Sequence, residues 1–153
     1  MIDLKHHLIL MAEDDTDDQL LVQEAFAECG VKEELRFVAD GEELLDYLMQ
    51  RGQYAGALSA PRPGLVLLDL NMPRKDGREA LKEIRAHPDL RQVPIVVFTT
   101  SRADTDIRQV YELGANSFIT KPPAFDALVS TVKRMVSYWF GLVELPAPKL
   151  AVP

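Results

Sequence analysis

Short, largely apolar runs recur along the chain and are separated by segments of mixed polarity. Runs of four or five such residues, bounded by polar or turn-forming residues, are typical of strands that a parallel sheet buries on both faces. The pattern therefore predicts five strands: LILMA at 8–12, LRFV at 35–38, LVLL at 65–68, IVVF at 95–98 and SFIT at 117–120.

Between these runs, apolar residues follow helical spacing. Val22, Ala25, Phe26 and Cys29 lie at positions i, i+3, i+4 and i+7, and Gly30 can end that helix. The same reasoning predicts helices around residues 44–48, 80–84, 107–111 and 125–136. Capping boxes mark three of the helix starts, namely Thr16 with Gln19, Asp40 with Glu43, and Asp76 with Glu79.

Strict alternation of strands and helices predicts the α/β class, with a doubly wound (βα)5 parallel sheet and helices on both faces. We expect one domain over residues 1–143 and a proline-rich tail over 144–153, with a long loop at 54–64. In sheets of this kind, ligands bind beyond the carboxyl ends of the strands.

Composition narrows the function classes. The chain has 153 residues, a net charge of −7 and no run rich in Lys and Arg, whereas a nucleic-acid or anionic-membrane binder usually needs a basic face. Cys29 is the single cysteine, which excludes an intrachain disulfide. The apolar run Leu8–Ala12 is too short for a signal sequence or a membrane span. We expect a cytoplasmic protein without nucleic-acid or membrane partners.

Carboxylates gather at the ends of two predicted strands. Glu13 and Asp14 follow the first strand, and Asp69 follows the third. Asp17 and Asp18 are explained by the first turn of a helix, where negative charge is favourable. Carboxylates that meet at a sheet edge repel one another, and a divalent cation resolves this repulsion.

The few oxygen ligands favour Mg²⁺ over a caged Ca²⁺. An EF-hand starting at Asp14 fails, because Gln19 stands where the loop needs glycine and Ala25 where it needs glutamate.

Asp69 is also a candidate nucleophile. An aspartate carboxylate can attack phosphorus to give an acyl phosphate. A cation, the ammonium group of Lys121 and the hydroxyl of Thr99 would stabilise the phosphoryl oxygens. Taken singly, each residue has an ordinary explanation: a cap for Asp69, a surface position for Lys121 and a strand end for Thr99.

Together these residues resemble a known family. Glu13–Asp14, Asp69, Thr99 and Lys121–Pro122 match, in order, the motifs of the receiver domain of two-component response regulators, over roughly residues 6–140. The stretches LLDLNMPRKDGREALKEI and ANSFITKPP, together with the WFGLVELP end, resemble the single-domain regulators related to the cyanobacterial phytochrome response regulator. The resemblance implies a flavodoxin-like receiver fold with strand order 2-1-3-4-5.

The resemblance also implies roles. Asp69 would accept a phosphoryl group from a sensor histidine kinase, and Thr99 and Lys121 would bind the phosphoryl oxygens. Mg²⁺, or Mn²⁺ as a substitute, would be held by Asp14 and Asp69, by the Asn71 carbonyl, and by Glu13 through water. Thr100 is bulkier than the family's usual small residue and is expected to slow the access of water. Phe118 would be the rotating aromatic, and the Lys121–Pro122 bond is usually cis in the family.

Two interaction surfaces are predicted. The kinase, which the subfamily resemblance implies is of the bacteriophytochrome type, would dock on Asp18, Leu21, Val22, Pro123 and Phe125. The apolar stripe near the C-terminus suggests a homodimer through Met135, Trp139, Phe140 and Val143. Since little chain follows Phe140, we expect a stand-alone regulator that signals by a change of conformation or dimerisation, and not an enzyme.

Two alternatives stay open at this point. One is a receiver-like interaction module that works without phosphate. The other is a small aspartate-nucleophile phosphatase, although its usual D-x-D pattern is here Asp69-Leu70-Asn71. A P-loop GTPase is excluded, because no G-x-x-x-x-G-K-[ST] occurs.

Overall fold

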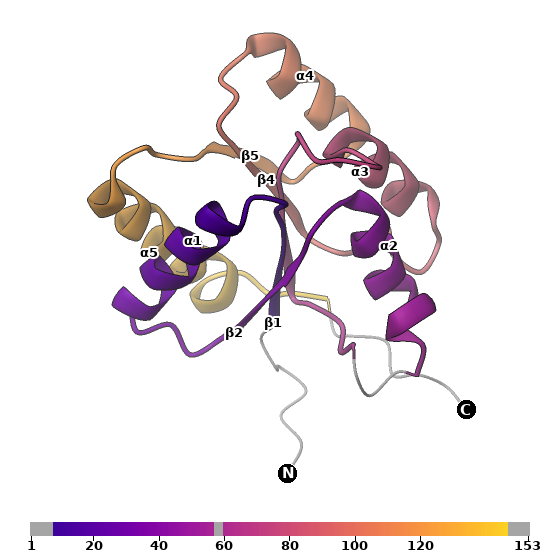
Figure 1. Ribbon diagram of the computed structural model, residues 1–153, viewed down its shortest axis with the longest axis horizontal. Helices are drawn as coiled ribbons and strands as arrows, with labels where there is room; N and C mark the ends of the chain where they lie inside the picture. Colours follow the sequence, from indigo (N-terminus) through magenta and orange to yellow (C-terminus); the bar gives the residue numbers. More distant parts are fainter. Residues whose placement is uncertain (1–7, 57–59, 147–153) are drawn as a thin grey trace.

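Five parallel strands form the centre of the structure, a computed structural model that describes residues 8–56 and 60–146 (Figure 1). The strand order is β2-β1-β3-β4-β5, which confirms the predicted doubly wound sheet. All four neighbouring pairs are parallel. The strands are β1 (Leu8–Ala12), β2 (Glu34–Val38), β3 (Leu65–Leu68), β4 (Ile95–Thr99) and β5 (Ser117–Thr120).

Helices cover both faces of the sheet, with α1 and α5 on one face and α2, α3 and α4 on the other (Figure 1). They are α1 (Thr16–Glu28), α2 (Gly41–Met49), α3 (Gly77–Ala86), α4 (Asp104–Leu113) and α5 (Phe125–Gly141). Among the described residues, no helix is both long and apolar enough to span a membrane.

The strand β1 shows how the core divides. Its five residues are all buried. Leu8, Leu10 and Ala12 pack toward α2 and α3, whereas Ile9 and Met11 pack toward α1 and α5. Because alternate side chains of a strand point to opposite faces, a run without polar residues is what this position requires. Burying each of the larger side chains contributes about 1.5–3 kcal/mol.

The helix starts correct one expectation. Asp15, not Thr16, caps α1, because its Oδ1 accepts hydrogen bonds from the backbone of Asp17 (2.8 Å) and Asp18 (3.3 Å). An ionised carboxylate is a stronger acceptor than a hydroxyl at the positive end of a helix. Gln19 donates instead to the carbonyl of Glu13 at 2.6 Å.

The other two caps are confirmed. Asp40 accepts from the Glu43 amide at 2.8 Å, and Asp76 accepts from the Glu79 amide at 3.0 Å.

A short 3-10 helix, η1 (Gly52–Tyr54), follows α2 and was not predicted. The Tyr54 hydroxyl donates to Glu43 Oε2 at 2.6 Å, and the Tyr47 hydroxyl donates to the Pro61 carbonyl at 2.9 Å. The two ends of the predicted 54–64 loop are therefore tied to α2. Residues 57–59 of that loop, and 147–153 of the predicted tail, lie outside the described residues.

Candidate functional site

The site lies where the carboxyl ends of β1, β3, β4 and β5 meet. Glu13 follows β1, Asp69 follows β3, Thr99 ends β4 and Lys121 follows β5. Backbone pairing continues past the strand ends. The amide of Glu13 donates to Val38 O (2.9 Å), and that of Lys121 donates to Thr99 O (2.7 Å). The sheet therefore fixes the backbone from which these side chains project.

Asp69 lies at the centre of the site and is 8% exposed. Its Oδ1 accepts a hydrogen bond from the Thr99 hydroxyl at 2.7 Å and from the Leu70 amide at 2.8 Å. Its Oδ2 lies 3.7 Å from the Lys121 ammonium nitrogen. One carboxylate oxygen is thus held by neutral donors, while the other faces a positive charge.

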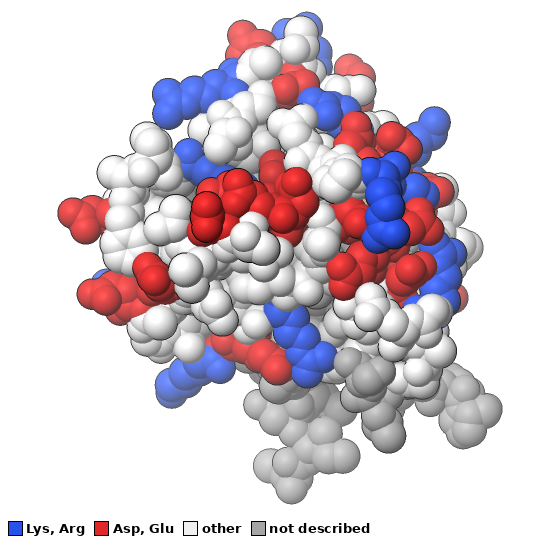
Figure 2. All heavy atoms as spheres, in the orientation of Figure 1, with Lys and Arg blue, Asp and Glu red and all other residues white. Residues whose placement is uncertain are grey.

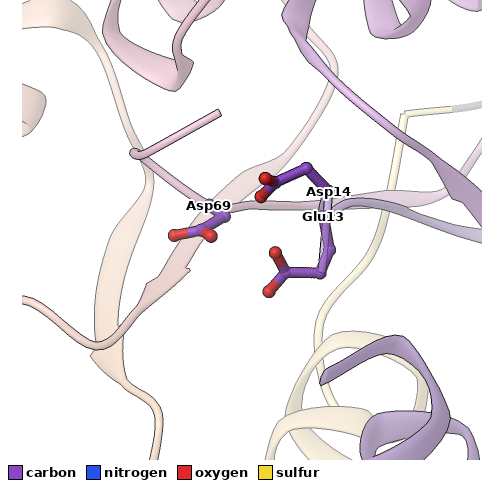
Figure 3. Close-up of side chains that lie close together, drawn as sticks. All are labelled: Glu13, Asp14 and Asp69. Atoms are coloured by element: carbon purple, nitrogen blue, oxygen red, sulfur yellow. The ribbon is translucent and has the colours of Figure 1, made fainter. Parts of the chain in front are cut away.

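Three carboxylates form a candidate cation site, as the sequence predicts. Oxygens of Glu13, Asp14 and Asp69 lie within 4.8 Å of one another, and Figure 3 shows the three side chains grouped beyond β1 and β3. Glu13 and Asp69 are buried and Asp14 is exposed. Such a set of hard oxygen donors that is open to solvent on one side suits Mg²⁺, which keeps several of its waters. Asn71 is exposed on the loop two residues after Asp69.

Lys121 neutralises part of this charge. Its ammonium group forms an ion pair with Glu13 Oε1 and lies 3.8 Å from Asp18 Oδ2. Burial raises the pKa of Glu13 to about 7, although the hydrogen bond and charge of Lys121 act against that rise. Burial alone would lower the pKa of Lys121, but the hydrogen bond to Glu13 and the charge of Asp69 outweigh it and raise that pKa.

The remaining switch candidates are placed as follows. Phe118 is half-buried and packs against the core cluster between the sheet and α2, α3 and α4. Thr100 is exposed. The Lys121–Pro122 bond is trans, which differs from the cis bond that the resemblance implies. For a bond before proline, the two isomers differ by only about 0.5–1 kcal/mol.

The docking candidates divide into core and surface. Leu21 is 45% exposed on α1 and Phe125 is 38% exposed on α5, the helix beside it (Figure 1). Asp18 is half-buried, and Pro123 is exposed. Val22 is buried among the α1 and α5 side chains, so its inclusion in a docking surface is wrong.

The dimer candidates are also mostly core. Met135 is 4% exposed, and Trp139 and Phe140 pack against the same cluster between α1, α5 and the sheet. Val143 is half-buried. A stripe with helical period marks the side of α5 that faces the sheet, so the exposed apolar residues lie outside it. Near the C-terminal end of α5 they are Tyr138 and, one residue beyond the helix, Leu142.

Sequence reasoning missed the contacts that surround the site. Ser101 donates to Asp106 at 2.6 Å, and Arg78 of α3 donates to the same carboxylate at 2.7 Å. Asp40 forms an ion pair with Arg74, in the loop that follows Asp69. The contacts of Arg78 with Asp106 and of Arg74 with Asp40 have no local sequence signal, because each joins segments that only the fold brings together.

Comparisons with known proteins agree with this geometry. The family model of the response regulator receiver domain matches residues 9–133. The response regulator Rcp1 of Synechocystis sp. is 42% identical over 140 residues, which are 92% of this chain and 93% of Rcp1. Its Mn²⁺-bound crystal structure superposes with a TM-score of 0.82, covering 92% of this chain and 99% of that one.

Two further crystal structures are similar over the same share of this chain. The phosphorylated cyanobacterial phytochrome response regulator RcpA is 43% identical, with a TM-score of 0.84, and 99% of it is covered. The response regulator RPA3017, described in red light signalling of R. palustris, is 36% identical, with a TM-score of 0.87, and 98% of it is covered.

Proposed function

The chain belongs to the response regulator receiver domain family, and we propose that Asp69 accepts a phosphoryl group from the phosphohistidine of a sensor histidine kinase. The single observation that carries this proposal is the surroundings of the Asp69 carboxylate. A hydroxyl (Thr99), an ammonium group (Lys121) and two further carboxylates (Glu13 and Asp14) meet at this one buried nucleophile.

The transfer needs little from the protein beyond position and charge. An Asp69 oxygen donates a lone pair to phosphorus, and the P–N bond of the phosphohistidine breaks. The electron pair of that bond returns to the imidazole, which leaves as neutral histidine if its other nitrogen is protonated. Thr99 and Lys121 lie on the two sides of the Asp69 carboxylate and would donate to the phosphoryl oxygens.

Mg²⁺ fits the carboxylates of Glu13, Asp14 and Asp69, and its charge would offset the negative charge of the phosphoryl oxygens. The Mn²⁺-bound crystal structure of Rcp1 supports Mn²⁺ as a substitute. Asn71 is proposed to add its backbone carbonyl.

The signal would be a change of conformation or of dimerisation. The hydrogen bond from Thr99 to Asp69 cannot persist unchanged once this carboxylate has become an acyl phosphate, so Thr99 would follow the phosphoryl group. Ser101, two residues on, would then carry the movement to α4 through Asp106. The partner would be a phytochrome-type kinase, because the relatives are described as phytochrome or red-light regulators.

The same proposal includes a cytoplasmic location without nucleic-acid or membrane partners, which the net charge of −7 supports. It also makes the chain a signalling domain whose own chemistry ends with the aspartyl phosphate and its hydrolysis.

Intact-protein mass after incubation with acetyl phosphate tests the proposal. Wild-type protein should gain the mass of one phosphoryl group with Mg²⁺ and none with a chelator. Asp69→Asn should gain nothing, whereas Asp76→Asn, a matched change in the same loop region, should behave as wild type. No adduct in any condition would favour the phosphate-independent interaction module instead.

A further inference from the structure

A third buried carboxylate, Asp40, lies beyond the carboxyl end of β2 and takes no part in the phosphoryl chemistry. Asp40 is 4% exposed. Its Oδ1 caps α2, and its Oδ2 accepts two guanidinium N–H groups of Arg74, from Nε at 2.8 Å and from Nη2 at 2.6 Å. A buried oxygen that takes two charge-assisted hydrogen bonds fixes the position of its partner.

That partner has an unusual backbone. Arg74 has φ of +63°, in the left-handed region that side chains other than glycine and asparagine rarely adopt. This conformation costs roughly 1–2 kcal/mol, so something must hold it. The guanidinium group of Arg74 is anchored on Asp40, although the side chain as a whole is 66% exposed. Figure 2 shows basic side chains set among acidic ones on this side of the molecule.

Gly41, the residue after Asp40, makes a second contact with the loop between β3 and α3. The amide of Gly41, the first residue of α2, donates to the carbonyl of Lys75 at 2.9 Å. A side chain at Gly41 would place its Cβ 2.4 Å from that carbonyl oxygen, so only glycine permits this approach. The start of α2 therefore holds the β3–α3 loop, residues 69–76, at both Arg74 and Lys75.

We propose that the Asp40–Arg74 ion pair is a positioning device for the divalent cation site. By anchoring Arg74 on the start of α2, the pair fixes the loop whose backbone carries Asp69 and Asn71. The affinity for the cation then depends on residues that do not contact it. This inference rests on the proposed function, in which Asn71 and Asp69 hold the metal.

The device and simple electrostatics predict opposite results at Arg74. Removing a positive charge near an acidic site strengthens cation binding if charge alone matters. Removing the device releases the loop and weakens binding. Outer-shell contacts of metal sites are typically worth about 10–100-fold in affinity, and an indirect one belongs at the low end, about 10-fold.

Electron paramagnetic resonance of free Mn²⁺, titrated against the full chain, measures this affinity directly. We expect Arg74→Asn to weaken Mn²⁺ binding about 10-fold. Asparagine tolerates the left-handed conformation, so the variant should fold. Arg74→Lys keeps the charge but loses the two-donor contact and should fall between Arg74→Asn and wild type.

Two controls complete the design. Arg51→Asn removes the same charge from an ion pair with Asp46, at the other end of α2, and should leave the affinity equal or slightly higher. Asp40→Asn can still cap α2 but loses the ion pair, so it should match Arg74→Asn. The double variant should bind Mn²⁺ no more weakly than either single variant, because each substitution alone already breaks the same ion pair.

The outcomes separate the two proposals. Unchanged or tighter Mn²⁺ binding by Arg74→Asn, with a thermal midpoint close to that of wild type, would overturn the positioning device and leave the proposed function standing. The positioning device would also be overturned if the two single variants changed the Mn²⁺ affinity in opposite directions and the changes cancelled in the double variant. Absence of Mn²⁺ binding by the wild-type chain would overturn both.

Discussion

At the scale of single residues, Glu13 shows how burial and charge compete. Glu13 is 1% exposed and would be neutral in an apolar setting, but Lys121 lies against it. The balance leaves its pKa at about 7, well above the ordinary value of 4.5. Its charge state therefore changes within the physiological range, and the charge of the cation site changes with it.

This titration predicts a pH dependence of metal binding. Cations bind the ionised carboxylate, so protons compete with the metal below the pKa of about 7 and cease to compete above it. For one such group, Mn²⁺ affinity should fall about 10-fold between about pH 8 and about pH 6. Titration of Mn²⁺ at the two pH values checks this, and Glu13→Gln should lose most of the difference. Equal affinities for the wild-type chain would contradict the prediction.

The site residues were predictable to the extent that the sheet determines them. Glu13, Asp69, Thr99 and Lys121 each end a strand, and parallel strands deliver their carboxyl ends to one edge. The sequence could not predict which atoms pair across that edge. The ion pair of Lys121 with Glu13 and that of Arg74 with Asp40 join residues far apart in the chain, through side-chain conformations that have no local signature.

At the scale of elements, Arg85 ties three segments together. From the last turn of α3, its guanidinium group donates to Gly114 O (2.7 Å), Val93 O (2.8 Å) and Asn116 Oδ1 (2.9 Å). Burial lowers the pKa of Arg85, in keeping with a guanidinium group surrounded by neutral acceptors. The end of α4 and the approaches to β4 and β5 depend on this one side chain.

We expect Arg85→Lys to lower the free energy of unfolding by about 2 kcal/mol, because an ammonium group cannot reach all these acceptors and leaves some unpaired. Urea unfolding measures this difference. Arg108→Lys, on the exposed side of α4, is the matched control and should change stability by less than about 0.5 kcal/mol. A loss at Arg85 no larger than at Arg108 would refute the role.

Elements were predicted where their pattern is long and local. The apolar runs gave all five strands, and the capping aspartates gave the starts of α2 and α3. The start of α1 was misplaced by one residue, since EDDTDD offers several possible caps and only geometry selects Asp15. The 3-10 helix η1 was missed because its order comes from Tyr54 and Glu43, which pair across the turn.

At the scale of the whole molecule, the apolar stripe of α5 was interpreted too broadly. The same spacing that predicted an interface at Met135 marks the side of the helix that faces the sheet. The apolar surface that stays exposed at this end of the molecule is smaller than the stripe suggested. Tyr138 is 49% exposed, and Leu142, just beyond the helix, is 74% exposed. Any homodimer through this end of the molecule must use these two side chains, with the exposed edges of Trp139 and Phe140 beside them.

This revised surface predicts which substitution would disrupt a dimer. If the chain pairs through the end of α5, light scattering should give twice the 17.2 kDa of one chain. Leu142→Ser should then return the protein to a monomer, because a serine hydroxyl in an apolar interface lacks a partner and costs binding energy.

Leu20→Ser is the matched control, since Leu20 of α1 is 54% exposed and lies outside the proposed interface, so it should leave the mass unchanged. Measuring each protein with and without acetyl phosphate tests whether phosphorylation shifts the equilibrium. A mass of 17.2 kDa at every concentration and in both states would exclude dimerisation as the output. The signal would then have to pass through a change of conformation alone, and Asp106 of α4, which Ser101 and Arg78 both contact, would be the place to look for it.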